Sequence, residues 1–207
     1  MGFCMRVGSG VVNQTSSRPR SIGVLIPMRD ESPRITECIQ QFKPYIDFIL
    51  ALDTGSIDNS AELALGAGAD VVVLAGKTRG QDEDRNLGCS MMPAGTNWIL
   101  ISDVDERFPV EFLQNIHAFI EENRVDSFRL PRDNFGIRYR YPDYQVKLVK
   151  RWVKWIGHPH CLGFDPVRMI RIDQVSCVTL DQHVIQHLPR RQDIERLWWK
   201  NEPVKGD

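Results

Sequence analysis

The stretch Trp98-Ile99-Leu100-Ile101-Ser102-Asp103-Val104-Asp105-Glu106 decides how this chain of 207 residues folds. Its first five residues are an apolar run typical of a buried strand, and three carboxylates follow where that strand ends. Buried apolar strands are typical of parallel sheets, and ligands bind beyond the carboxyl ends of such strands. Closely spaced carboxylates attract hard cations such as Mg²⁺ and Mn²⁺. The stretch therefore predicts a site for a metal ion and a diphosphate. The alternative is a solvated helix start, because Pro109 follows and acidic side chains favour a helix N-terminus.

The preceding part of the chain alternates between apolar runs and helix-like segments. Residues 21–27, 46–52 and 69–75 predict strands, and residues 33–42 and 59–66 predict helices between them. Strands that alternate with helices imply a parallel sheet with right-handed crossovers. We therefore expect the polar loops after the first, second and fourth strands to share one edge of the sheet.

Four polar segments at these strand and helix ends resemble motifs of the family 2 glycosyltransferases. They are Ile26-Pro27-Met28-Arg29-Asp30-Glu31, Leu52-Asp53-Thr54-Gly55-Ser56-Ile57-Asp58, Asp84-Arg85-Asn86-Leu87-Gly88 and the strand that ends in Asp103-Val104-Asp105. Their order and spacing agree with the family, and the resemblance covers residues 21–190. It implies an α/β fold: a GT-A-like, Rossmann-type domain with a mostly parallel central sheet flanked by helices. It also implies inverting, metal-dependent transfer of a sugar from a nucleoside diphosphate sugar, expected to be a UDP-sugar, to an acceptor hydroxyl.

Two downstream segments are similar to the small soluble branch of lipopolysaccharide core glycosyltransferases. Residues 142–148 match its Pro-Asp-x-Gln-x-(Arg/Lys)-Leu pattern, and residues 155–161 resemble its Trp-x-Gly-x-x-His-Glu pattern. Cys161 stands where that branch has Glu, so a base supplied by that Glu must be replaced here, or the acceptor differs. Asp143 and His160 are the leading candidates for the catalytic base, which must reach the acceptor hydroxyl. Further candidates are Asp165 and Glu106.

The resemblance also implies ligands for a divalent metal cofactor, Mn²⁺ or Mg²⁺. Asp105 corresponds to the direct ligand, and His187 resembles the late His that completes the metal shell in many GT-A proteins. His183, four residues earlier, competes for that role. Imidazole is a common metal ligand, although a single His is more often an ordinary surface or core residue.

Five residues are predicted to bind the nucleotide, by resemblance: Pro27, Glu31, Asp53, Arg85 and Asp103. Asp53 would accept a hydrogen bond from the base, Arg85 would lie near base or phosphate, and Asp103 near the ribose or a metal-bound water. Three of them have a plainer alternative. Asp53 suits an ordinary turn, Arg85 a helix ion pair, and Glu31 the charge preference of a helix start.

Length and composition favour one domain, with residues 1–20 as a flexible tail and 21–207 as the catalytic domain. Residues 21–108 are predicted to hold the nucleotide sugar and 109–207 the acceptor. The hydrophobic fraction of 42% is ordinary, and no run approaches the ~20 apolar residues of a transmembrane helix. The five cysteines lack C-x-x-C spacing, which favours reduced thiols in a cytoplasmic protein.

Positive charge is concentrated in the second half of the chain. Residues 129–207 contain 15 Lys and Arg against 9 Asp and Glu, although the net charge of the whole chain is −1. Basic residues there, among them Lys147, Lys150 and Arg151, are interleaved with aromatic residues, among them Trp152 and Trp155. This pattern favours an anionic acceptor, either a glycolipid or a nucleic acid; the alternative is a solvated basic face.

Other classes of function remain open. A sugar nucleotidyltransferase shares the α/β fold, but a Gly-rich loop usually follows its first strand, and residues 27–31 contain no Gly. A non-catalytic module that binds nucleotide sugars or polyanions is the other alternative. The retained Asp103 and Asp105 argue against it, whereas Cys161 leaves it open. The sequence does not indicate which oligomeric state the protein has.

Overall fold

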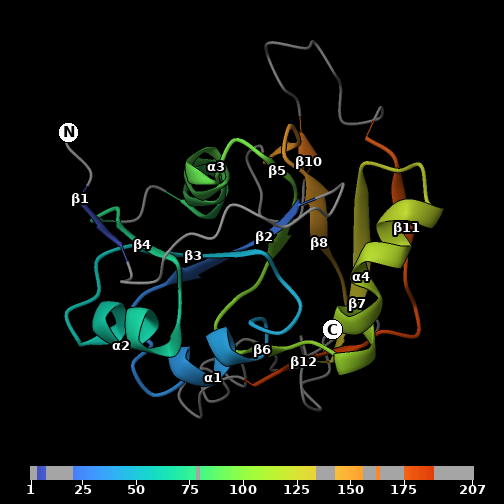
Figure 1. Cartoon of the computed structure of the whole chain (residues 1–207). Helices are drawn as coiled ribbons and strands as arrows, with labels where there is room; N and C mark the ends of the chain where they lie inside the picture. Colours follow the sequence, from blue (N-terminus) through green and yellow to red (C-terminus); the bar gives the residue numbers. More distant parts are fainter. Residues whose placement is uncertain are drawn as a thin grey trace, which may run out of the picture.

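The computed structural model describes residues 4–7, 21–77, 80–133, 143–155, 162–163 and 175–188. A curled sheet runs through the molecule, with helices packed on its faces (Figure 1). Its central part contains four parallel strands in the order β4-β3-β2-β5. They are β2 (Ser21–Met28), β3 (Phe48–Asp53), β4 (Val71–Leu74) and β5 (Thr96–Ile101). These are the four predicted strands, and the α/β fold with a mostly parallel sheet is confirmed.

The sheet continues beyond β5 with strands of mixed direction. β8 (Asp143–Lys150) is antiparallel to β5, and β7 (Ser127–Asp133) is antiparallel to β8. β12 (Ile185–His187) runs parallel to β7 and pairs antiparallel with the short β6 (Glu106–Arg107). β11 (Cys177–Thr179) also pairs with β7, whereas β9 (Lys154–Trp155) and β10 (Leu162–Gly163) form a separate ribbon. Residues far apart in sequence therefore meet next to the end of β5.

Alternate residues of the central strands face two different apolar layers. Val24, Ile49 and Leu100 belong to the layer covered by α1 (Ile35–Gln40), α2 (Ser60–Ala67) and α4 (Val110–Glu122). Their neighbours in sequence, such as Leu25 and Leu50, belong to the layer covered by α3 (Gln81–Met91). Both faces of the sheet are thus buried, which is why its strands are continuously apolar.

The predicted helices at 33–42 and 59–66 correspond to α1 and α2. Residues 4–7, which we predicted to be part of a flexible tail, instead form β1 (Cys4–Val7), antiparallel to β4. The reason is that β4 would otherwise leave its backbone groups unpaired at the sheet edge. No helix in the described ranges has the length and apolar composition that a membrane crossing requires. Cys38, Cys89 and Cys177 carry free thiols, while the side chains of the other two cysteines lie outside the described set.

Candidate active site

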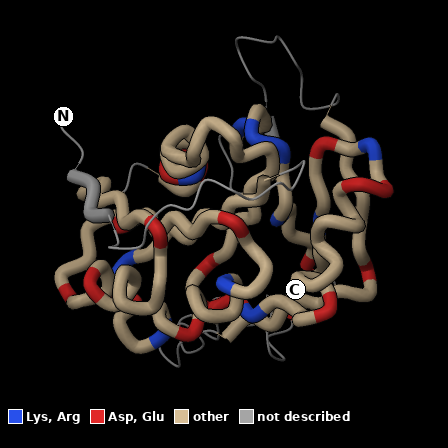
Figure 2. Tube along the Cα trace, in the orientation of Figure 1, with Lys and Arg blue, Asp and Glu red and all other residues tan. Residues whose placement is uncertain are grey.

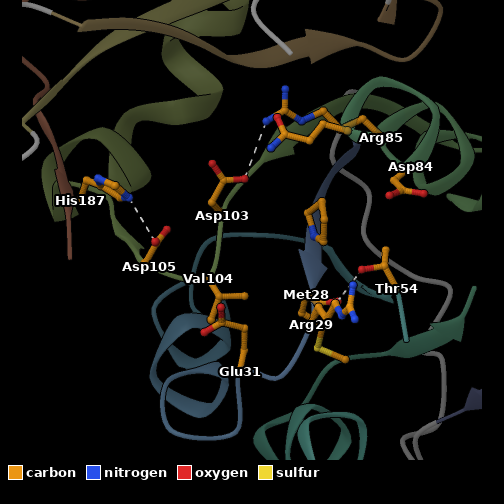
Figure 3. A pocket seen from close by; sticks show the side chains of 12 residues that line it. Met28, Arg29, Glu31, Thr54, Asp84, Arg85, Asp103, Val104, Asp105 and His187 are labelled. Carbon is orange, nitrogen blue, oxygen red and sulfur yellow. Dashed lines mark hydrogen bonds and ion pairs between the residues drawn. The ribbon is translucent and has the colours of Figure 1, made fainter. Parts of the chain in front are cut away.

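A pocket of about 370 Å³ lies beyond the carboxyl ends of β2, β3 and β5 (Figure 3). Its wall is predominantly polar. It is lined by Pro27, Met28, Arg29, Glu31, Thr54, Gln81, Asp84, Arg85, Asp103, Val104, Asp105 and His187. The pocket therefore brings together six of the predicted site residues: Pro27, Glu31, Arg85, Asp103, Asp105 and His187.

His187 lies directly beside Asp105, although 82 residues separate them in sequence. The His187 Nε2 atom is 3.1 Å from the Asp105 Oδ2 atom, and both side chains are largely buried. The β6–β12 pairing causes this, because it aligns His187 with Glu106 and lets the Leu188 N–H donate to the Asp105 carbonyl at 2.7 Å. Arg34 fixes the other side of the segment, donating to the Leu188 carbonyl at 2.6 Å. His183 lies elsewhere, buried between aromatic rings of α4.

Asp103 is surrounded by cations. Arg85 NH2 lies 3.7 Å from one carboxylate oxygen, while Lys147 Nζ and Arg132 NH1 lie 3.6 and 4.0 Å from the other. Burial raises the pKa of this carboxyl, but the three cations outweigh that effect and lower it to about 2. Asp103 is therefore fully ionised at neutral pH and is held by the protein's own positive charges.

Glu106 occupies the centre of this cluster and has no solvent exposure. Its carboxylate accepts the backbone N–H of Asp103 at 3.0 Å and the ammonium of Lys147 at 2.6 Å, and Arg132 lies 3.5 Å away. Burial raises the pKa of Glu106, and the ammonium of Lys147 opposes this effect. The Glu106 carboxylate therefore holds the loop that carries Asp103 in place, and it does not line the pocket.

Arg85 is held in place by α3 and by a tryptophan. Its guanidinium carbon lies 4.8 Å from the centre of the Trp155 ring. Asn86 exchanges two hydrogen bonds with the Trp155 backbone, at 2.8 and 2.9 Å, and so joins α3 to β9. Gly88 permits close packing of α3 on β2, since a Cβ atom there would lie 2.3 Å from a Leu25 methyl carbon. Arg85, Asn86 and Gly88, three residues of the segment 84–88, thus each have a structural role in this chain.

Asp53 organises the loop after β3 and is not among the residues that line the pocket. Its Oδ1 atom accepts the backbone N–H groups of Gly55 and Ser56, at 3.0 and 2.7 Å. The hydroxyl of Ser56 in turn accepts the N–H of Asp30, which has a positive φ of 52°. The turn that we predicted as the plainer alternative is therefore present, while Thr54 from the same turn lines the pocket. A role of Asp53 towards a base stays a prediction.

Asp143, one of the two leading candidate bases, is not among the residues that line the pocket. Asp143 accepts two hydrogen bonds from Arg132, at 2.8 and 3.1 Å, and one from Gln145 at 2.7 Å. These contacts suit an anchor that connects β8 to β7, and Asp143 does not line the pocket. His160 and Asp165 lie outside the described residues.

The five residues named above from the basic half, all of them described, are divided between two places. Lys147 and Trp155 are buried beside the pocket, whereas Lys150, Arg151 and Trp152 line a different depression. They do not form one acceptor surface. The sequence analysis did not predict that three cations, Arg34, Arg132 and Lys147, belong to the site. The one sequence feature that pointed towards any of them was the Lys in the matched segment 142–148.

The donor atoms at Asp105 and His187 suit a divalent ion. No group of three or more His, Cys, Asp or Glu residues with metal-binding geometry occurs in the described part of the chain. A carboxylate oxygen and an imidazole nitrogen are nevertheless acceptable to Mn²⁺, and such ions in phosphate sites often take their remaining ligands from water and substrate. The pair therefore fits a metal that binds together with a diphosphate.

Comparison with known proteins identifies the family of the chain. A model of the family "Glycosyl transferase family 2" matches residues 23–165. The chain belongs to this family, and the predicted enzyme class, glycosyltransferase, is confirmed at that level. The closer resemblance to the lipopolysaccharide core branch stays a prediction.

Solved structures share the fold at low sequence identity. Glucosyl-3-phosphoglycerate synthase from Mycobacterium tuberculosis, in complex with Mn²⁺, UDP and glucosyl-3-phosphoglycerate, has a TM-score of 0.60 and 16% identity. The match covers 86% of this chain and 75% of that one. TarS 1-349 of S. aureus, in complex with UDP-GlcNAc, has a TM-score of 0.59 and 14% identity, over 83% of this chain and 59% of that one.

A curated relative is the "TPR repeat-containing protein Synpcc7942_0270" of Synechococcus elongatus, 26% identical over 113 residues. The match covers 54% of this chain, and it spans only 27% of the length of that relative.

Proposed function

We propose that this chain transfers a sugar from a UDP-sugar to an acceptor hydroxyl, with inversion, and that it needs Mn²⁺ or Mg²⁺. The observation that carries the proposal is the Asp105–His187 pair at 3.1 Å, beside Asp103 and Arg85 in one pocket at the end of β5. Support for the donor comes from the two structural neighbours, which bind UDP and UDP-GlcNAc. A cytoplasmic location is part of the same proposal.

Each residue of the pocket has a separate task in this proposal. Asp105 and His187 would hold the metal, which would supply Lewis-acid chemistry to the leaving diphosphate. Arg85, stacked on Trp155, faces the nucleotide or its phosphates. Asp103, kept ionised by its cations, accepts hydrogen bonds from the ribose. Pro27, Glu31 and the Asp53 turn shape the base side of the pocket, and Pro27 lies beyond the last β2–β5 pair, where its missing N–H breaks no hydrogen bond to β5.

The acceptor is proposed to be anionic, and one neighbour supports this because it binds phosphoglyceric acid. The base stays open between His160 and Asp143. Of the two, Asp143 would first have to release the hydrogen bonds from Arg132 and Gln145.

Hydrolysis of UDP-glucose and UDP-GlcNAc, measured as released UDP with and without Mn²⁺, tests the proposal. We expect metal-dependent release that is abolished in Asp105→Ala and retained in Glu122→Ala, which removes an exposed carboxylate elsewhere. Calorimetry of UDP with Mn²⁺ on the same proteins separates loss of binding from loss of turnover. Wild-type turnover that needs no metal, or full activity of Asp105→Ala in saturating Mn²⁺, would contradict the proposal. UDP binding without any turnover would identify a binding module instead.

A further inference from the structure

A second and larger depression lies at the opposite end of β5 from the pocket. We call it the basic groove. Its volume is about 930 Å³, and it is formed by the start of β5, the end of α4 with the loop that follows, and the turn between β8 and β9. It is lined by Ala94, Thr96, Asn97, Trp98, Ile120, Glu121, Asn123, Arg124, Val125, Lys150, Arg151, Trp152 and Lys154. Because β5 rises about 3.3 Å per residue, Thr96 and Asp103 are roughly 20 Å apart.

Positive charge exceeds negative charge in this groove. Figure 2 shows basic segments at the β8–β9 turn and on the loop after α4. Lys150 is neutralised by Asp126, at 2.9 Å. Arg151 donates to the carbonyls of Met92 and Pro93, which leaves its charge uncompensated by any described carboxylate.

Two further cations of the groove are available to a ligand. Arg124 and Lys154 have no ion-pair partner among the described residues; Arg124 is exposed and Lys154 is half-buried. Glu121 is the one carboxylate among the described lining residues. Three cations therefore face one carboxylate around a concave surface, which favours an anionic ligand.

The floor of the groove distinguishes between classes of anionic ligand. Trp98 is only 3% exposed and lies under the ammonium of Lys150, so among the described lining residues a base could stack only on the partly exposed Trp152. The exposed large apolar residues of the described chain, Ile57, Val110 and Tyr144, all lie outside the groove, so it lacks the apolar anchors of a membrane-binding surface.

The remaining polar features suit a ligand with many hydroxyl groups. Trp152 is partly exposed along one wall, and Asn97 and Asn123 add amide groups to the lining. The hydroxyl of Thr96 is buried without a hydrogen-bond partner in the described structure. Amphipathic indole and amide groups between cations are complementary to the hydroxyl and anionic groups of acidic or phosphorylated sugar units.

We propose that the basic groove binds an anionic saccharide chain, and that it holds a distant part of the acceptor while the reacting hydroxyl lies in the pocket. The saccharide identity rests on the proposed function, since a glycosyltransferase of this kind acts on a hydroxyl acceptor. The groove would then retain a long acceptor without touching the donor. Because β5 is buried, the acceptor would have to pass over the protein surface and span more than the roughly 20 Å between the two ends of the strand. Short acceptors would not benefit from it.

Calorimetry with a heparin-derived octasaccharide, in the absence of donor and metal, tests this proposal on the full chain. The variant Arg124→Gln/Lys154→Gln removes two charges that have no described partner, so its fold should be unaffected. Lys43→Gln/Lys77→Gln removes two exposed charges outside the groove and is the matched control. We expect the groove variant to bind about tenfold more weakly with a smaller salt dependence, because exposed ion pairs are screened, and the control to bind like the wild type.

Three results would overturn the inference. The first is an equal loss of octasaccharide affinity in the groove variant and the control, and the second is an unchanged affinity of the groove variant. The third is that the desulfated octasaccharide binds the wild type as tightly as the sulfated one. Tighter, groove-dependent binding of phosphatidylglycerol vesicles or of oligo(dT) would replace the saccharide by a membrane or a nucleic acid. The assay needs no donor, so its outcome is independent of UDP-sugar hydrolysis. An inactive protein that binds the octasaccharide would refute only the proposed function, and an active one that does not bind it would refute only the groove.

Discussion

Replacing Lys147 by Met should destabilise the protein strongly, because the ammonium is the closest partner of a fully buried carboxylate. Lys147 is 1% exposed and Glu106 is 0% exposed, and their charged atoms are 2.6 Å apart. Removing one partner of a buried ion pair typically costs about 3–5 kcal/mol, since the other charge stays uncompensated. We expect this range for Lys147→Met. Arg132, 3.5 Å from Glu106, supplies partial compensation and favours its lower end.

Urea unfolding of four proteins measures this effect: wild type, Lys147→Met, Glu106→Gln and the double variant. Glu106→Gln keeps an acceptor for the Asp103 N–H and removes the charge that needs the ammonium. The double variant should therefore be more stable than Lys147→Met alone, with a coupling energy of about 1–3 kcal/mol. Lys43→Met, at an exposed position, should stay within about 0.5 kcal/mol of the wild type.

The same series connects the ion pair to the pocket. Asp103 loses the cation 3.6 Å from its Oδ2 atom in Lys147→Met, so its pKa should rise and UDP affinity should fall. The reasoning is refuted if Lys147→Met unfolds like the exposed control, or if the double variant is no more stable than Lys147→Met. Additive single-variant effects would mean that the two charges do not depend on each other.

Three further predictions concern the residues around the pocket. His187→Ala should weaken Mn²⁺ binding at least tenfold in a calorimetric titration with UDP while urea stability changes little; unchanged Mn²⁺ affinity would remove this His from the metal site beside Asp105. Gly88→Val should cost about 1–3 kcal/mol in urea unfolding, since its side chain would overlap Leu25, and a neutral effect would disprove the tight α3 contact. The lowered pKa of Asp103, about 2, means that its carboxylate stabilises the fold above pH ~4 and that this contribution is lost as the pH falls through 2. The free energy of unfolding of the wild type should therefore approach that of Asp103→Asn by about 1 kcal/mol between pH 5 and pH 2. This value is reduced for solvent screening, because the Asp103 side chain is 36% exposed. A stability difference that stays constant over this pH range would contradict the prediction.

The parallel half of the fold could be predicted because its signals are local. Each central strand is an apolar run long enough to cross a sheet that is covered on both faces, and each ends at a polar loop. The same logic predicted that the polar loops after β2, β3 and β5 share one edge of the sheet, whereas Arg85 was assigned to the site by resemblance to the family. The later strands carried no comparable signal, because β6 and β12 contain two and three residues. Their pairing depends on partners 80 residues away in sequence.

The cations of the site were missed for a related reason. Arg34, Arg132 and Lys147 lie on α1's N-cap, β7 and β8, and nothing local distinguishes them from surface residues. The excess of basic residues after 129 indicated only that charge accumulates there, and it wrongly grouped the buried Lys147 with the exposed end of β8. Charge composition predicts how many cations a segment has, whereas the register of β7 and β8 decides which of them face the carboxylates.

The distribution of these cations bears on which carboxylate receives the metal. Asp103 has three cationic neighbours, so a divalent ion bound there would be repelled by charges that the protein already supplies. Asp105 has no Lys or Arg within ion-pair distance in the described structure, and its neighbour there is His187. A neutral imidazole can act as a metal ligand. Under the proposed function, a divalent ion is therefore expected at Asp105, and Asp103 is expected to accept hydrogen bonds from the hydroxyl groups of a ribose. The two aspartates of one motif can thus differ in function because β8 contributes a buried lysine to one and β12 contributes a histidine to the other.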